Sequence, residues 1–322
     1  MASEVLVTGA AGFLGRHVVS ALRARGRGVR ALVRRPPGAP FPEGVEVFTA
    51  DLSASADLGP AVAGIDGVLH LATPMHGDAE SILRDAVLGT RRLLDAVERS
   101  SAKRFVLASS LSVYDFEAAE GVVDEGSALE RRSEARDAYT TAKLRQEELC
   151  RESCASAGIA LTVLRPAYVW GTGREFPPTL GLEIGPLRVL VAPSRRLPSI
   201  HVENCADAFA EVLRAGDRAD GTFDLVDFPE VTARTFLADL LRSSGRSGVV
   251  LPVPYAPSHA CVRLLHALAP RRVRERLPSF LAPARFAARF KPVRVSGSRF
   301  RERFGWRPPV SRERCLERTF PA

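Results

Sequence analysis

The sequence predicts an α/β fold in which a doubly wound parallel sheet is followed by a smaller C-terminal lobe. Three observations support this prediction. Short apolar runs alternate with helical segments, each run is apolar at nearly every position, and a glycine-rich turn follows the first run. Continuous apolar runs are typical of parallel strands that are buried on both faces. The expected strands are Glu4–Thr8, Val29–Val33, Val45–Thr49, Gly67–Ala72, Phe105–Ala108 and Ile159–Leu164.

Apolar residues spaced three and four apart predict helices between most of these strands. The first helix, Phe13–Arg25, has Leu14, Val18, Val19 and Leu22 on one face. Further helices are expected at Ser81–Ser100 and Arg136–Ala157. A helix between two parallel strands crosses over in the right-handed sense, so this alternation predicts sequential crossovers along the sheet.

The turn after the first strand has the glycine spacing of a dinucleotide-binding loop. Gly9 permits the sharp turn, Gly12 lets the backbone approach a pyrophosphate, and Gly15 lets the helix pack close to the strand. The start of the helix adds unpaired N–H groups that favour phosphate. A glycine turn with only a structural role is the alternative. We therefore expect a Rossmann-type core whose cofactor contacts here are Gly9, Ala11, Gly12, Phe13, Leu14 and Gly15.

The end of the second strand bears on which nicotinamide cofactor is bound. An acidic residue there would bind the ribose 2′-hydroxyl of NAD, but the sequence has Arg34 followed by Arg35. A guanidinium can pair with a 2′-phosphate, so NADP is expected, with NAD as the alternative. In a chain this rich in arginine, Arg34 as an ordinary solvated charge is the other interpretation.

Two further strand ends are expected to contact the cofactor, because ligands of such sheets bind at the carboxyl edge. Asp51 and Leu52 follow the third strand, where Asp51 either accepts a hydrogen bond from the adenine or caps a helix that begins at Ser53. His70 is expected to be a packed strand residue. The residues after it that are expected to line the cofactor are Leu71, Ala72 and Thr73.

Tyr139 and Lys143 are four residues apart, which places a phenol and an amine on one face of a helix. A free phenol has a pKa of about 10. A nearby ammonium, together with the positive charge of an oxidised nicotinamide, is expected to lower it so that Tyr139 exchanges a proton near neutrality. Lys143 is also expected to hold the cofactor. Ser110 ends the fifth strand, where its hydroxyl could orient a substrate oxygen or simply cap a turn. An exposed helix face is the structural alternative for the pair.

The chain is longer than one core usually needs, so we expect residues 1–173 to form the NAD(P)-binding core and residues 174–322 a substrate-binding lobe. Prolines between residues 177 and 198 predict turns. A helix at Ala206–Ala215 and a strand at Thr222–Val226, within a stretch near 200–228, are expected to return to the core. Arginine-rich amphipathic stretches then follow, at Val262–Ala269 and Arg285–Phe290.

Together these residues resemble the extended short-chain dehydrogenase/reductase family, also described as the NAD-dependent epimerase/dehydratase family. The resemblance covers roughly residues 4–215 and rests on the glycine turn, the Tyr139/Lys143 pair and the serine after the fifth strand. It extends to an Arg-Pro segment at Leu164–Gly171, so it implies that Pro166 contacts the cofactor, and to a His-Val-x-Asn segment at His201–Ala208. The further motif Phe304–Pro308 looks like the family's C-terminal Gly-Trp-x-Pro turn.

Departures from the family pattern narrow the activity that the resemblance implies. Tyr168 stands where members acting on nucleotide sugars usually have asparagine. Together with Asn204, this difference makes the sequence look more like the branch of hydroxysteroid dehydrogenases and dihydroflavonol reductases. We expect an oxidoreductase that interconverts a ketone and a secondary alcohol, with catalytic Ser110, Tyr139 and Lys143. A nucleotide-sugar epimerase is the alternative, and a non-catalytic cofactor-binding protein is the second alternative.

The composition limits the classes of partner and ligand that we expect. The formal net charge is +8, but no nucleic-acid-binding motif accompanies it, so no nucleic acid is expected. The five cysteines lack metal-ligand spacing, so we expect no metal and reduced thiols in a cytoplasmic protein. A small-molecule substrate is expected and a homodimer stays open. The leucines and arginines of Cys261–Phe290 predict a lid over the substrate pocket, in preference to contact with a membrane surface.

Overall fold

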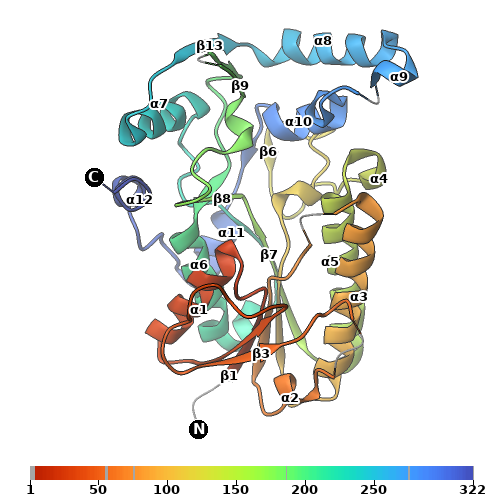
Figure 1. Cartoon of the computed structure of the whole chain (residues 1–322), viewed down its shortest axis with the longest axis vertical. Helices are drawn as coiled ribbons and strands as arrows, with labels where there is room; N and C mark the ends of the chain where they lie inside the picture. The colour runs from red at the N-terminus through yellow and green to blue at the C-terminus, as the bar shows by residue number, and fades with distance from the viewer. Residues whose placement is uncertain (1–3, 55–56, 75–76, 186, 275, 322) are drawn as a thin grey trace.

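In the computed structural model, which describes residues 4–54, 57–74, 77–185, 187–274 and 276–321, a seven-stranded sheet forms the core (Figure 1). Every neighbouring pair of its strands is parallel. This confirms the predicted Rossmann-type, doubly wound sheet. In spatial order the strands are β12 (Gly221–Leu225), β7 (Ala160–Pro166), β5 (Arg104–Ala108), β4 (Gly67–His70), β1 (Glu4–Thr8), β2 (Gly28–Val33) and β3 (Val45–Thr49).

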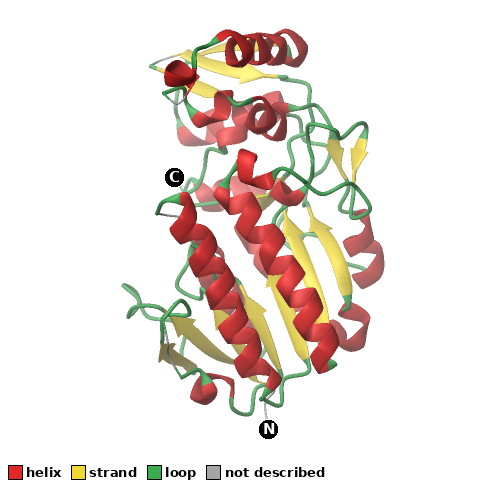
Figure 2. Cartoon of the chain, turned by 90° about the vertical axis from the view of Figure 1, so that its right-hand side faces the viewer, coloured by secondary structure: helices red, strands yellow, loops and turns green. Residues whose placement is uncertain are grey.

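The strand order reverses between β1 and β4, which creates the crevice where doubly wound folds bind ligands. Helices cover both faces: α1 (Phe13–Ala24) packs with α6 (Val202–Ala215), and α3 (Ala79–Glu98) packs with α5 (Ala138–Ala157). Figure 2 shows the last two side by side across one face of the sheet. Alternate residues of β1 enter the two cores, because successive side chains of a strand point to opposite faces.

Most predicted boundaries shift by one or two residues, and three differences bear on the site. The strand predicted as Gly67–Ala72 ends at His70, so Leu71 to Thr73 form a loop. The helix predicted to begin at Ala206 begins at Val202, where the His201 side chain accepts from the Glu203 N–H as an N-terminal cap. Asp51 caps no helix, because its carboxylate accepts from the backbone N–H and hydroxyl of Ser53 in a local turn. The next helix, α2, spans Gly59–Val62.

The C-terminal half contains more regular structure than its prolines predict. A three-stranded sheet has the order β13 (Val249–Val253), β10 (Leu187–Val191), β9 (Leu182–Ile184). The helices of this half are α7 (Ala233–Ser244), α8 (Tyr255–Leu268), α9 (Arg271–Arg274) and α10 (Pro283–Phe290), followed by α11 (Ser298–Phe304) and α12 (Arg312–Thr319).

Short elements connect the two halves of the chain. The parallel pairs are β8 (Tyr168–Trp170) with β11 (Ser199–His201), and β6 (Val122–Val123) with β14 (Arg294–Val295). The helix α4 spans Ser133–Arg136.

The leucine-rich part of α8 does not act as a packed lid. Leu264, Leu265 and Leu268 are exposed, whereas Val262 is buried against α10. The prediction of a lid over the pocket is therefore wrong for these leucines, because the helix turns its other face toward the lobe. Within the part of the chain that the structure describes, no helix combines the length and apolar character needed to cross a bilayer.

Candidate active site

The glycine turn between β1 and α1 fits a dinucleotide. Gly9 has φ +66°, and a Cβ on it would lie 2.9 Å from the Ala72 nitrogen. A Cβ on Gly15 would overlap the Gly9 carbonyl, so this glycine allows α1 to pack against the turn. Gly12 is the N-terminal cap of α1 and supplies no side-chain hydrogen bond. The first N–H groups of the helix are therefore available to an anion.

A buried hydrogen-bonded chain fixes the loop after β4. The His70 Nδ1 lies 2.7 Å from the Thr8 hydroxyl, which also accepts from the Ala72 N–H at 3.2 Å. On the other side, the His70 Nε2 lies 3.0 Å from the Thr90 hydroxyl. Burial, followed by the charge of Lys143, lowers the pKa of His70 to about 3, so the imidazole is neutral. As expected, His70 is a packed strand residue, and it holds the loop in place.

Lys143 lies between the ends of two neighbouring strands. Its Nζ donates to the Thr73 hydroxyl at 2.6 Å and to the Ala108 carbonyl at 2.5 Å. The Thr73 hydroxyl in turn donates to the Ala72 carbonyl at 2.9 Å. Burial lowers the pKa of Lys143 to about 7, although the charge of Glu147 opposes this shift. The amine is therefore a fixed donor at the carboxyl edge of the sheet, with a pKa close to neutrality.

Tyr139 lies one turn before Lys143 on α5, and its ring centroid is 5.8 Å from the Lys143 Nζ. Ser110, which follows β5, acts on Tyr139 as a hydrogen-bonding side chain that lowers the pKa of the phenol. The Ser110 Oγ also accepts from the Ser112 N–H at 3.1 Å, so the serine both caps a turn and reaches the phenol. The structure thus brings Ser110, Tyr139 and Lys143 together at one strand end.

The lowered pKa expected for Tyr139 stays a prediction, because it includes the charge of an oxidised nicotinamide. Burial raises the pKa of Tyr139 above its usual value, and the hydrogen bond from Ser110 lowers it only in part. The charge that acts to lower it comes from Arg174. The Lys143 Nζ is directed to Thr73 and Ala108, and its own burial disfavours the charged form.

The residues predicted for the adenosine end lie beyond β2 and β3. Arg34 is exposed, and the charges of Arg34 and Arg35 help to lower the pKa of Asp51, after the larger effect of its hydrogen bonds to Ser53. Leu52 packs against Gly89 of α3, where a Cβ would lie 3.1 Å from the leucine Cβ. The arginines and the carboxylate therefore share one surface at the sheet edge.

The remaining predicted cofactor residues lie along the same edge. Phe13 is half-buried, and the Arg174 guanidinium lies over its ring at 5.0 Å. Ala11 is exposed on the glycine turn. The side chains of Leu14 and Leu71 pack against the core, which leaves their backbone for any ligand contact. Pro166 is buried at the end of β7.

Comparison with known proteins identifies the family. The model of the NAD dependent epimerase/dehydratase family matches residues 5–225, which include the glycine turn, Tyr139 and Lys143. The chain belongs to this family. The resemblance predicted from the motifs is thereby confirmed.

Among curated relatives of this family member, a ketoreductase of Stigmatella aurantiaca, named for 4-hydroxy-2-methyl-3-oxo-4-farnesyl-3,4-dihydroquinoline-1-oxide, is 30% identical over 98% of this chain and 95% of its own length. A 3-beta-hydroxysteroid dehydrogenase of Mycolicibacterium neoaurum is 29% identical over 68% of this chain and 63% of its own. A solved UDP-glucuronic acid 4-epimerase of Bacillus cereus in complex with NAD has a TM-score of 0.73 at 19% identity, over 98% of this chain and 97% of that one. At that identity the solved structure supports the fold alone.

The sequence analysis did not predict a buried ionic network that lies next to Lys143. Glu147, one helical turn after Lys143, accepts from the Ser109 hydroxyl at 2.5 Å and from the Arg165 guanidinium at 2.7 and 2.8 Å. Arg165 also donates to the Tyr114 hydroxyl, which donates to Asp224 at 2.8 Å. The spacing of Glu147 after Lys143 was the available signal, but its partners lie on other strands and leave no local pattern.

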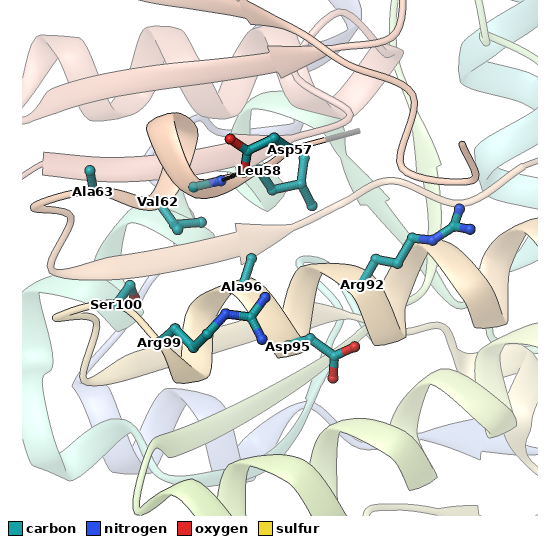
Figure 3. Close-up of a pocket in the computed structure, with 10 residues that line it drawn as sticks. Asp57, Leu58, Val62, Ala63, Arg92, Asp95, Ala96, Arg99 and Ser100 are labelled. Atoms are coloured by element: carbon teal, nitrogen blue, oxygen red, sulfur yellow. Dashed lines mark hydrogen bonds between the residues drawn. The ribbon is translucent and has the colours of Figure 1, made fainter. Parts of the chain in front are cut away.

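One cavity of the molecule is separate from these residues. A cavity of about 370 Å³ lies between α2 and the end of α3 (Figure 3). It is lined by Asp57, Leu58, Gly59, Val62, Ala63, Arg92, Asp95, Ala96, Arg99 and Ser100. These segments precede β4 and β5, so the cavity lies at the amino edge of the sheet, whereas Lys143 lies at the carboxyl edge. None of the predicted site residues lines it.

Proposed function

We propose that this family member reduces a ketone to a secondary alcohol, and catalyses the reverse oxidation, with a nicotinamide cofactor. The observation that supports this most directly is the convergence of Ser110, Tyr139 and Lys143 beside the glycine turn. A phenol bound by a serine hydroxyl can give a proton to a carbonyl oxygen. No carboxylate occurs from Ser109 to Val113, so the strand end offers no acid of the kind a dehydration needs.

The residues of the crevice fit a dinucleotide cofactor, and we propose NADPH as the preferred form. The turn at Gly9–Gly15 would hold the pyrophosphate, and Thr73 and Lys143 the nicotinamide ribose. Exposed Arg34, with Arg35, would pair with the 2′-phosphate. The cofactor, when bound, supplies the hydride.

The protein's own residues move the proton and orient the carbonyl. Tyr139 donates its phenolic proton to the carbonyl oxygen, and the Ser110 hydroxyl donates a hydrogen bond to the same oxygen. The raised pKa of Tyr139 keeps the phenol protonated, which is the form that reduction requires. Lys143 is fixed by Ala108 and Thr73, so its amine, when protonated, keeps a positive charge near the phenol.

We further propose that residues 174–322, apart from the elements that return near 200–228, form the lobe that recognises a partly apolar substrate. The half-buried Tyr168 faces this lobe, and the charges of Arg174 and Arg289 act on its phenol. The names of two relatives support an apolar substrate, because one contains a farnesyl group with a 3-oxo group and the other a steroid.

A panel of hydrophobic ketones tests the proposal. We expect NADPH to be consumed in proportion to alcohol formed, and Tyr139→Phe to lower kcat by on the order of 10²–10⁴-fold while cofactor binding is retained. Glu148→Gln, which alters an exposed side chain of the same helix, is the control and should keep wild-type rates. Turnover of a UDP-sugar without net change in cofactor absorbance would instead establish an epimerase. Wild-type activity of Tyr139→Phe would disprove the mechanism.

A further inference from the structure

Exposed apolar side chains gather in one segment of this protein. Among the described residues ten large apolar side chains are exposed, and seven of these lie between residues 249 and 273. The seven are Val249, Val250, Leu251, Leu264, Leu265, Leu268 and Val273. They belong to β13, α8 and α9, which form the end of the molecule opposite the N-terminus (Figure 1). We call these three elements the distal surface. A grouped apolar surface of this kind marks an interaction site.

The orientation of α8 is the reverse of that of an ordinary surface helix. Its inner face packs on α10, where the rings of Tyr255 and His259 stack on Phe286 at 6.1 and 6.0 Å. Leu264 and Leu268, on the opposite face, are 60% and 73% exposed. The outer face is therefore apolar, whereas a helix that faces water normally presents polar residues there.

The positive charge of the protein lies in the same segment. Residues 240–290 contain nine arginines and one glutamate, a formal net charge of +8. This equals the formal net charge of the whole chain, so the remaining residues balance one another. Exposed guanidiniums lie beside the apolar face of α8 and after it, at Arg263, Arg272, Arg274 and Arg276.

We propose that the distal surface binds peripherally to a lipid bilayer that contains anionic headgroups. The outward leucines of α8 would enter the boundary between headgroups and acyl chains, and the surrounding arginines would pair with lipid phosphates. A second copy of this chain fits less well, because the same surface on both partners would bring two segments of charge +8 together. A nucleic acid would leave the exposed leucines in water.

This binding surface is independent of the reaction proposed above but belongs to the lobe proposed for its substrate. The helix α10, on which α8 rests, contains Arg289, whose pKa is lowered by burial and in part restored by the nearby Tyr168. The lobe that would receive an apolar substrate is therefore the lobe that would contact the membrane. Binding to vesicles requires neither cofactor nor substrate, so it tests the surface alone.

The experiment is flotation of the full chain with vesicles of phosphatidylcholine mixed with phosphatidylglycerol, compared with phosphatidylcholine alone. We expect binding to the anionic vesicles at low salt and release at high salt. The double variant Leu264→Ser, Leu268→Ser should lose at least about tenfold in affinity. Each exchange Arg272→Ser or Arg274→Ser should weaken binding roughly fivefold.

Exposed residues on α3 provide matched controls. Leu88, which is 40% exposed, and Arg91 lie outside the distal surface, so Leu88→Ser and Arg91→Ser should bind like the wild type. All substituted side chains are exposed, so each variant should keep the wild-type Tm. No binding to anionic vesicles at low salt would overturn the proposal. So would equal losses in the control variants, or a leucine-dependent dimer without vesicle binding.

Discussion

Glu147 and Arg165 form a buried two-point ion pair directly behind Lys143. The Arg165 Nε lies 2.8 Å from the Glu147 Oε1, and its Nη2 lies 2.7 Å from the Oε2. Burial raises the pKa of Glu147, but the hydrogen bonds and charge of Arg165, with smaller effects from Ser109 and Arg151, outweigh it and the net shift is downward. In Arg165 burial lowers the pKa, and Glu147 more than reverses this. Each charge therefore depends on the other to remain in the protein interior.

Removing one partner should be costly, because the other is left as an uncompensated buried charge. We expect Glu147→Gln to lower the free energy of unfolding by about 3–5 kcal/mol, measured by urea denaturation. The adjacent Glu148 pairs with Arg145 at 2.8 Å on the exposed face of the same helix. Glu148→Gln should cost less than about 1 kcal/mol. Similar losses in the two variants would contradict this account of the ion pair.

The pKa of Lys143 gives the reaction a pH dependence. Because burial lowers this pKa to about 7, the amine loses its charge as the pH rises through neutrality in the free enzyme. If the charge assists the phenol, kcat/KM for ketone reduction should fall roughly tenfold per pH unit above about pH 7. Lys143→Arg should abolish this limb, since a guanidinium does not titrate there. A flat wild-type profile across neutrality would count against a role for the ammonium.

The same shift has a consequence for stability. Lys143 loses its proton near pH 7 in the native state and near its ordinary pKa of 10.5 in the unfolded state, so the native state binds fewer protons between these values. The contribution of Lys143 to the free energy of unfolding should therefore rise with pH across this window. Lys143→Met, compared with the wild type by chemical denaturation, should remove that part of the pH dependence. An unchanged difference between the two proteins at all pH values would refute the prediction.

Ser110 is expected to act on the reaction with little effect on folding. Its hydroxyl lowers the pKa of Tyr139 and caps only a short turn. Ser110→Ala should lower kcat by on the order of 10²–10³-fold, as when one oxyanion donor is lost, with a small change in Tm. Ser109→Ala is the comparison, because the Ser109 hydroxyl donates to Glu147 in the buried network. That variant should instead lower stability by about 1–3 kcal/mol.

Arg34 provides a test of cofactor preference. Arg34→Ala should raise KM for NADPH by about tenfold or more, since a hydrogen bond between charged groups is lost, while KM for NADH changes little. Arg99→Ala, an exposed arginine at the amino edge of the sheet, is the control and should alter neither constant. A parallel rise in both constants would mean that Arg34 does not contact a 2′-phosphate.

Much of the sheet could be predicted from the sequence, because its signals are local. Six of the seven strands of the main sheet lie before Gly173, and apolar runs predicted all six. The run Thr222–Val226 predicted the seventh to within one residue. The region after Gly173 was harder, since β9 and β10 are short and flanked by prolines. Their pairing joins residues far apart in the chain, as when β10 pairs with β13, and no local period reports such a contact.

The sequence by itself determined that Tyr139 and Lys143 share a helix face and that Gly9 and Gly15 permit the tight turn, because helical periodicity and glycine sterics are local properties. Only the tertiary structure decided what surrounds those groups. Strand ends distant in sequence supply Thr73 and Ala108 to Lys143, burial sets the pKa values, and packing on α10 turns the leucines of α8 outward. Solvation and long-range partners depend on how the elements assemble, which residue spacing does not encode.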